Sequence, residues 1–285
     1  MSIPHTLADL VEKVGNSTVR IDAGHAWSGT GTVWALFEKG SVVVTAHHVV
    51  DRDEGIELGL PDGSTVAATL VGRDPGTDLA VLKADAALEP LAFRDLDGLR
   101  VGDFTVAVAR PGRTARATFG IVSALGRDVW RTAHGGRIDA YVEPDLSMPP
   151  GFSGGPLVDL EGKAIGVNSR GLSRRSHLAV PRSTLDRVIA ELLAHGKVRR
   201  GYLGVGVHAV KLPAPDEAGV LVHAVEDGGA AQKAGILIGD AIVSLDGAKI
   251  HSPWDLASAL QTKVDVDVKL EIIRAGNKQS LSAHV

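Results

Sequence analysis

The stretch GFSGGPLVDLEGKAIGV, residues 151–167, decides the fold. Its first residues fit the pattern G-x-S-x-G, in which a nucleophilic serine stands on a sharp turn between a strand and a helix. They also fit the pattern G-x-S-G-G-P-L, in which the serine stands on a loop between two strands. A glycine-rich hairpin without any chemistry is the third interpretation, because glycine is frequent in turns.

The residues that follow Ser153 argue against the strand-to-helix turn. Gly155 and Pro156 are poor residues for a first helical turn, and Leu157 and Val158 lead into the turn DLEGK and a second apolar run, AIGV. A β-hairpin is therefore predicted here. The strand-to-helix turn would also require parallel strands that alternate with helices.

The chain upstream of Ser153 consists of short runs of β-branched or alternating residues. Turn signals such as PDGS, DPGT and LEGK separate them. The main runs between about residues 18 and 180 are STVRI, TGTVWALF, SVVVTA, IELGL, STVAATLVG, DLAVLKA, FTVAVA, ATFGIVSAL, IDAYVEP, PLVDL and KAIGVNS. No helical pattern interrupts them, which predicts an antiparallel all-β domain, either a sandwich or a pair of barrels.

Helical patterns flank this region and mark the domains. Residues 7–14 carry leucine and valine at helical spacing. Residues 181–200, PRSTLDRVIAELLAHGKVRR, predict a helix capped by Ser183, with Asp186 at the box position, and ended by Gly196. We place the first domain at residues 1–195, a linker at 196–200 and a second domain at 201–285. In the second domain GAAQKAG and SPWDLASALQTK predict helices, the latter capped by Ser252.

Composition excludes several classes of function. The 285 residues are 44% hydrophobic and 22% charged, as in globular proteins, and the net charge of −4 gives no reason to expect nucleic acid as a partner. Without cysteine the chain has neither disulfides nor thiolate metal sites. The first residues show no signal peptide, and no run approaches the ~18 apolar residues of a membrane span. As written, a cytoplasmic protein is expected; a processed or truncated form would belong to the cell envelope.

A serine on a loop between strands needs a histidine and an acid upstream to become a nucleophile. SVVVTAHHVV at residues 41–50 and DPGTDLAVLK at residues 74–83 supply them, so the order is His48, Asp78 and Ser153. Each is expected at a strand end, where a side chain is held rigidly. His47 would point to the opposite face of such a strand, so we assign it to packing or surface and expect no metal site.

The segments TAHHVVD, DPGTDLAVLK and GFSGGPLVDLEGKAIGVNS resemble the catalytic blocks of the HtrA (Deg) family of PDZ-bearing serine proteases. The resemblance implies a mostly β chain, with a chymotrypsin-like double β-barrel protease domain and a catalytic triad of His48, Asp78 and Ser153. It also implies a homotrimer and chemistry that needs no cofactor.

The same resemblance assigns the loop around the serine. Gly151, Phe152 and Ser153 would form the oxyanion hole, with the N–H groups of Gly151 and Ser153 as donors. Ser147, six residues before the serine, and Asn168 would form a specificity pocket for small or medium apolar side chains. The sequence departs from the family where Phe152 replaces the usual Asn and Pro149 replaces a small polar residue.

RGYLGVGV at residues 200–207 and the segments after it resemble a bacterial PDZ domain, a smaller α+β unit. The resemblance places the carboxylate-binding loop at Tyr202, Leu203, Gly204 and Val205, and implies binding of peptides with hydrophobic C-termini. The leading hypothesis is thus a serine endopeptidase that cleaves unfolded or misfolded proteins. The alternative is a proteolytically inactive chaperone or PDZ adaptor on the same scaffold.

Overall fold

The computed structural model describes residues 3–24, 28–132, 135–173, 176–213 and 218–285. It divides the chain into two compact units, Met1–Val198 and Arg199–Val285. The division falls within the linker expected at residues 196–200. Among the described residues, no helix is both long and apolar enough to cross a membrane.

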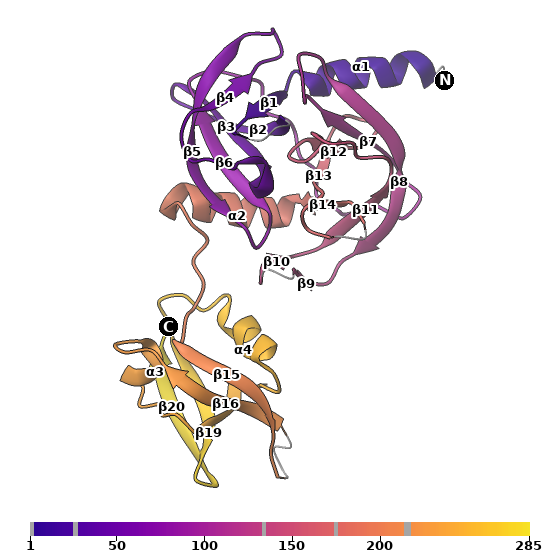
Figure 1. The fold of residues 1–285 in the computed structure, drawn as a ribbon. Helices are drawn as coiled ribbons and strands as arrows, with labels where there is room; N and C mark the ends of the chain where they lie inside the picture. The colour runs from indigo at the N-terminus through magenta and orange to yellow at the C-terminus, as the bar shows by residue number, and fades with distance from the viewer. Residues whose placement is uncertain (1–2, 25–27, 133–134, 174–175, 214–217) are drawn as a thin grey trace. The chain divides into compact units, whose positions relative to one another are not determined.

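Two closed six-stranded barrels form the first unit (Figure 1). The first barrel runs in the order β1-β2-β3-β6-β5-β4, with antiparallel pairs throughout. Its strands are β1 (Thr18–Asp22), β2 (Gly29–Phe37), β3 (Gly40–Ala46), β4 (Ile56–Gly59), β5 (Thr65–Asp74) and β6 (Leu79–Ala84). This finding settles the choice between sandwich and barrels and confirms the predicted fold class.

The second barrel runs in the order β11-β14-β13-β12-β7-β8. Its strands are β7 (Phe104–Ala109), β8 (Arg116–Gly126), β11 (Tyr141–Asp145), β12 (Pro156–Val158), β13 (Ala164–Ser169) and β14 (Leu178–Pro181). A two-stranded ribbon of β9 (Trp130–Arg131) and β10 (Arg137–Ile138) precedes β11. The residues after Ser153 form the antiparallel hairpin β12-β13, as Pro156 and the DLEGK turn predicted.

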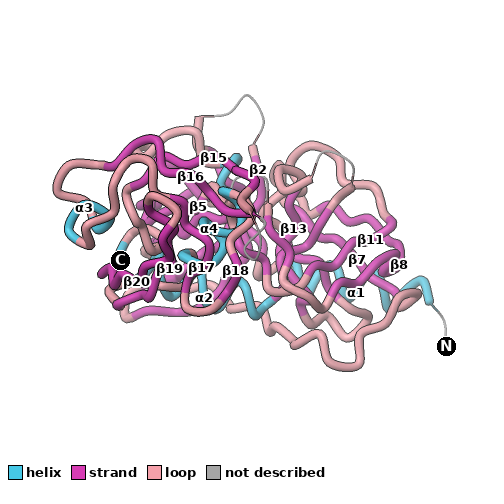
Figure 2. Tube along the Cα trace, turned by 90° about the horizontal axis from the view of Figure 1, so that it is seen from below, coloured by secondary structure: helices cyan, strands magenta, loops and turns pink. Residues whose placement is uncertain are grey.

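Two helices cover the barrels. The helix α1 (Ile3–Gly15) lies against the second barrel beside β7 (Figure 1 and Figure 2) and buries Leu10 and Val14. The helix α2 (Arg182–His195) contacts β5, β6 and β14, and therefore bridges the two barrels. Its apolar face packs on outward-facing residues of β3 such as Val42 and Val44, while Val43 points into the first barrel. Strand β3 is thus buried on both faces, which explains its continuous apolar run.

The ends of α2 partly differ from the prediction. Gly196 ends the helix in the left-handed region with a φ of 69°, as glycine allows. Ser183, however, does not cap it: the helix begins at Arg182 after Pro181, and no side chain caps its first turn. Because Pro181 still pairs in the barrel ladder, strand β14 leads directly into the helix and Ser183 already lies within it.

The second unit is an antiparallel sheet in the order β15-β16-β17-β19-β20. Its elements are β15 (Val205–Lys211), β16 (Ala218–Val225), α3 (Ala230–Lys233), β17 (Ala241–Leu245), β18 (Ala248–Lys249), α4 (Pro253–Leu260), β19 (Asp267–Arg274) and β20 (Asn277–His284). Ser252 caps α4 by accepting from Asp255 N–H at 3.2 Å, as predicted. Strand β15 ends the sheet order, so one of its edges is open to an added strand among the described residues.

The burial of α2 generates a prediction about stability. Leu192 has no exposed surface, whereas its neighbour Leu193 is 40% exposed. Leu192→Ala should lower the free energy of unfolding by about 3 kcal/mol, because it removes buried methyl groups and leaves a cavity. Leu193→Ala, the same chemical change, should cost less than about 1 kcal/mol. Urea-induced unfolding followed by circular dichroism measures both, and equal losses would contradict the bridging role of α2.

Candidate active site

His48 lies just beyond the end of β3, in a short 3-10 turn η1 (His47–Val49). The strand geometry expected for His47 and His48 is therefore wrong. The turn is fastened to Asp78: His47 N–H donates to the Asp78 carbonyl at 2.9 Å, and His48 N–H donates to Asp78 Oδ1 at 3.0 Å. The backbone thus fixes the place from which the half-exposed His48 ring enters the site.

Asp78 ends a tight turn and faces the His48 ring. The carboxylate of Asp74 accepts from Gly76 N–H, Thr77 N–H and the Thr77 hydroxyl, which closes this turn. Asp78 adopts a φ of 54°, an uncommon region for a residue with a side chain. Its carboxylate oxygens lie 2.9 and 2.8 Å from His48 Nδ1 while its side chain is only 7% exposed, so its acceptor groups are directed at the ring.

Ser169, at the end of β13, completes the surroundings of this carboxylate. Its hydroxyl donates to Asp78 Oδ2 and accepts from the N–H groups of Gly171 and Leu172 at 3.1 and 3.2 Å. The sequence prediction missed Ser169 and named its neighbour Asn168. The available signal was the alternation along β13, which turns successive residues to opposite faces.

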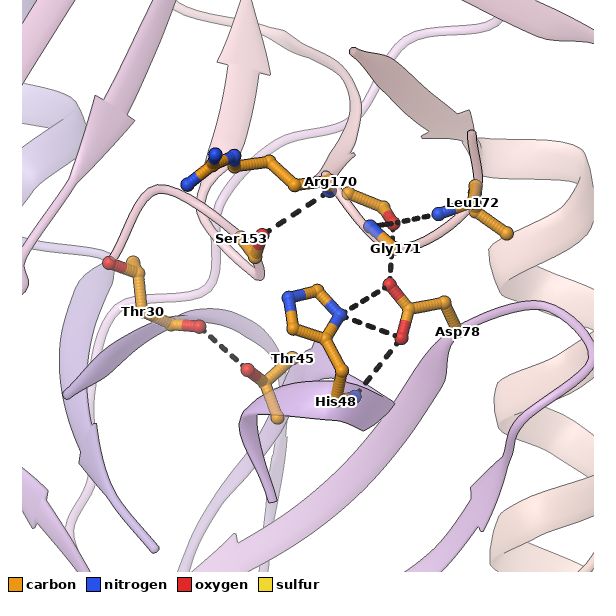
Figure 3. A network of polar contacts seen from close by, with 9 residues as sticks. Thr30, Thr45, His48, Asp78, Ser153, Arg170, Gly171 and Leu172 are labelled. Carbon is orange, nitrogen blue, oxygen red and sulfur yellow. Dashed lines mark hydrogen bonds and ion pairs between the residues drawn. The ribbon is translucent and has the colours of Figure 1, made fainter. Parts of the chain in front are cut away.

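Ser153 lies across the His48 ring from Asp78 (Figure 3). Its side chain is buried, and its Oγ accepts from Arg170 N–H at 3.3 Å. The structure therefore brings His48, Asp78 and Ser153 together from both barrels: the first two come from the ends of β3 and β6, and the serine comes from the loop before β12.

The loop of Ser153 is held by threonines of β2. Thr30 Oγ1 donates to the Gly151 carbonyl at 2.7 Å, and Thr32 Oγ1 donates to the Gly154 carbonyl at 2.9 Å. Gly154 has a φ of 85°, and a Cβ there would lie 1.9 Å from the Thr30 carbonyl oxygen. Glycine is required at this position, because the backbones of the two barrels touch.

The amides of this loop fall into two groups. Within the described chain, the N–H groups of Gly151 and Ser153 have no hydrogen-bond acceptor, whereas Phe152 N–H donates to the Pro149 carbonyl at 3.2 Å. The Phe152 side chain is 1% exposed in the core of the second barrel. Phe152 was predicted as part of the oxyanion-hole loop, with Gly151 and Ser153 as its donors. Its own amide is engaged within the loop, and its side chain anchors that loop in the core.

Ser147 and Asn168 were predicted to form a specificity pocket. Two cavities adjoin the site, of about 350 and 520 Å³, and neither residue lines either of them. Asn168 has no exposed surface, because its strand is buried in the barrel, while Ser147 faces solvent. The first cavity is lined by His48, Gly151 and Ser153, and Arg170 lines both.

Two histidines near the site have lowered pKa values. Burial lowers the pKa of His47, and Arg73 and His48 act in the same direction against the attraction of Asp78 and Asp74. Burial together with the Arg170 guanidinium lowers the pKa of His177. Both effects favour the neutral ring. Among the described residues, no group of three or more acidic or histidine side chains is placed to hold a metal ion.

The four residues predicted for carboxylate binding lie in the second unit, before and at the start of β15. Tyr202 is 67% exposed, whereas Leu203 is buried in the core of the unit. Gly204 has a φ of 76°, and its carbonyl accepts from Glu226 N–H at 2.9 Å. The nearby Glu226 carboxylate raises the pKa of Tyr202. The left-handed Gly204 turns the chain immediately before Val205 enters the open edge strand.

Comparison with protein families defines the class. Residues 29–167 match the trypsin-like peptidase domain, and residues 201–285 match the PDZ domain. Among solved structures, the HtrA-type protease AlgW with decapeptide is 28% identical, with a TM-score of 0.76 and 97% of each chain covered. A variant of AlgW with tripeptide is 30% identical, with a TM-score of 0.75, and covers 98% of this chain and 96% of its own. The chain belongs to the HtrA family.

Curated relatives agree with this assignment. A probable periplasmic serine endoprotease DegP-like of Brucella suis is 39% identical over 80% of this chain and 46% of its own length. Its counterpart in Pseudomonas fulva is 35% identical over 90% of this chain and 55% of its own length. The chain thus spans about half the length of the curated relatives it matches.

Gly171 generates a prediction about the site. A Cβ on Gly171 would lie 2.8 Å from both Asp78 Oδ2 and His48 Nδ1, closer than real contacts allow. Gly171→Ala should displace the ring from the carboxylate and slow reaction of Ser153 with a fluorophosphonate probe at least about tenfold. Gly112→Ala is the control, because a Cβ there meets nothing within 4 Å. Equal labelling rates for the two variants would contradict the packing described.

Proposed function

We propose that the chain is a serine endopeptidase that forms an acyl-enzyme at Ser153. The observation that carries this proposal is the placement of the His48 ring between the Asp78 carboxylate, 2.8 Å from Nδ1, and the hydroxyl of Ser153. The Asp78 carboxylate accepts from His48 N–H and from the Ser169 hydroxyl, and both bonds keep it directed at the ring. A scaffold with no proteolytic task would gain nothing from this arrangement.

The chemistry follows from these positions. His48 removes the proton of the Ser153 hydroxyl as Oγ attacks the scissile carbonyl, and Asp78 stabilises the resulting imidazolium. His48 then gives the proton to the leaving amine as the peptide bond breaks. Water, deprotonated by the same ring, hydrolyses the ester and restores Ser153. No cofactor takes part in these steps.

The negative oxygen of the tetrahedral intermediate needs hydrogen-bond donors. We assign this role to the N–H groups of Gly151 and Ser153, which have no other acceptor within the described chain. Thr30 supports them indirectly, because its hydroxyl holds the Gly151 carbonyl at 2.7 Å and so fixes the peptide bond between Gly151 and Phe152, which lies between the two donors. The buried Phe152 anchors the same loop to the second barrel.

The substrates we propose are unfolded or misfolded proteins, with peptides that end in hydrophobic residues bound at the PDZ domain. The open edge of β15 allows such a peptide to add as a strand, and the loop from Tyr202 to Val205 lies at its start. The AlgW structures with decapeptide and tripeptide support peptide binding in this family.

Assembly and location are also proposals. A homotrimer is expected from the family resemblance alone. A location in the cell envelope is supported by relatives named as periplasmic endoproteases, and nothing among them supports the cytoplasmic alternative. The competing function is that of a proteolytically inactive chaperone or PDZ adaptor. A measurement of proteolytic activity distinguishes it from the endopeptidase.

Ser153→Ala provides the direct test. The wild type should label with a fluorophosphonate probe and cleave an unfolded protein, and Ser153→Ala should abolish labelling and reduce cleavage about 10⁶-fold, because no other nucleophile replaces the hydroxyl. Ser64→Ala, in an exposed turn, should retain both activities. If the wild type neither labels nor cleaves, with or without a hydrophobic C-terminal peptide, the adaptor function is the correct one.

Gly204 tests the PDZ assignment. Its φ of 76° and its proximity to Glu226, 3.1 Å from a Cβ added there, make alanine unfavourable in the binding loop. Gly204→Ala should weaken binding of a peptide ending in valine about tenfold or more, measured by fluorescence anisotropy. Gly228→Ala is the matched control, since its φ is 72° and a Cβ there meets nothing within 4 Å. Equal affinities would place the carboxylate elsewhere.

A further inference from the structure

Arg170 occupies a position in the cleft that the proposed chemistry does not use. It directly follows β13 and Ser169, and its backbone N–H contacts Ser153 Oγ at 3.3 Å. Its side chain is exposed and lines both cavities next to the site. Figure 3 shows the guanidinium extending away from Asp78 on the side of Ser153. The positively charged side chain of Arg170 therefore starts from a backbone that contacts the Ser153 hydroxyl.

Among the described residues, none neutralises the charge of Arg170. No carboxylate in that part of the chain lies within ion-pair distance of its guanidinium. Asp22, whose carboxylate accepts from the cavity residue Ser28, already pairs with Arg20 at 2.7 Å. Asp78 is engaged by His48 and Ser169. An exposed arginine with several free donors in a concave site is therefore available to a ligand.

The two cavities differ in charge. Apart from His48 and Arg170, the first cavity is lined by neutral residues and has no carboxylate among them. The second has Glu143 and Asp145 on its wall, together with Arg170 and His177. A negative side chain bound in the second cavity would face two carboxylates. In the first, the charged or titratable side chains it would meet among the described lining residues are the Arg170 guanidinium and the His48 imidazole.

We propose that Arg170 is a specificity-determining residue, which selects substrates with an aspartate or glutamate beside the scissile bond, in the part of the chain that occupies the first cavity. This inference rests on the proposed function. The planar guanidinium can bind a carboxylate through two parallel hydrogen bonds, a geometry that a neutral side chain does not offer. In the cleft a lysine at the same substrate position is repelled by the same charge.

Peptide substrates test this selection. Cleavage sites in an unfolded protein are mapped first, and peptides around one site are then made with Asp, Asn or Lys at each neighbouring position. For the wild type, kcat/KM should be about tenfold higher with Asp than with Lys at one of these positions, and the ratio should shrink at about 1 M salt, where the Debye length is about 3 Å. Arg170→Gln should bring the ratio close to one, and Arg170→Glu should invert it.

Arg100→Gln is the matched control, because its side chain is 82% exposed and lines neither cavity. It should keep the wild-type ratio. Fluorophosphonate labelling of each variant verifies a folded site. Two results would overturn the role of Arg170 and leave the proposed function intact. One is a wild type that labels but shows no charge preference at any position; the other is an Asp-to-Lys ratio of kcat/KM that persists in Arg170→Glu. A wild type that neither labels nor cleaves would overturn the proposed function and this inference with it.

Discussion

The contact between β2 of the first barrel and the Ser153 loop of the second is the constraint on which the site depends. Thr30 and Thr32 hold the carbonyls of Gly151 and Gly154, and Thr30 N–H donates to the Ser153 carbonyl at 3.2 Å. Each bond joins residues more than a hundred positions apart in the chain. Because the backbones touch at Gly154, a side chain at that position would push the Ser153 loop away from β2.

The same contact extends to α1 through Arg110. Its backbone N–H donates to Thr30 Oγ1 at 2.9 Å, and its buried guanidinium donates to the carbonyls of Gly15, Thr18 and Arg113. Burial lowers the pKa of Arg110, yet three carbonyl acceptors compensate the cost of removing its charge from water. The first helix, both barrels and the Ser153 loop therefore meet around one threonine hydroxyl.

Local patterns were sufficient for much of the fold. Alternating and β-branched runs predicted nearly all the long strands, Pro156 predicted the hairpin after Ser153, and Ser252 predicted the start of α4. These features act over a few residues, so they can be read along the chain. Ser183 failed as a cap because β14 is a short strand that pairs in the barrel and runs directly into α2, and pairing with a distant strand is not visible locally.

The sequence by itself determined the β-rich architecture. It also predicted a linker at residues 196–200 and a triad of His48, Asp78 and Ser153. Only the tertiary structure decided what surrounds them. Ser169 reaches Asp78 across 91 positions, Asn168 turns inward instead, and Arg170 faces both cavities. These three residues are consecutive, and their different roles follow from the direction in which each side chain points. Strand alternation separates neighbours onto two faces, but the face that meets the cleft is set by the closure of the barrel.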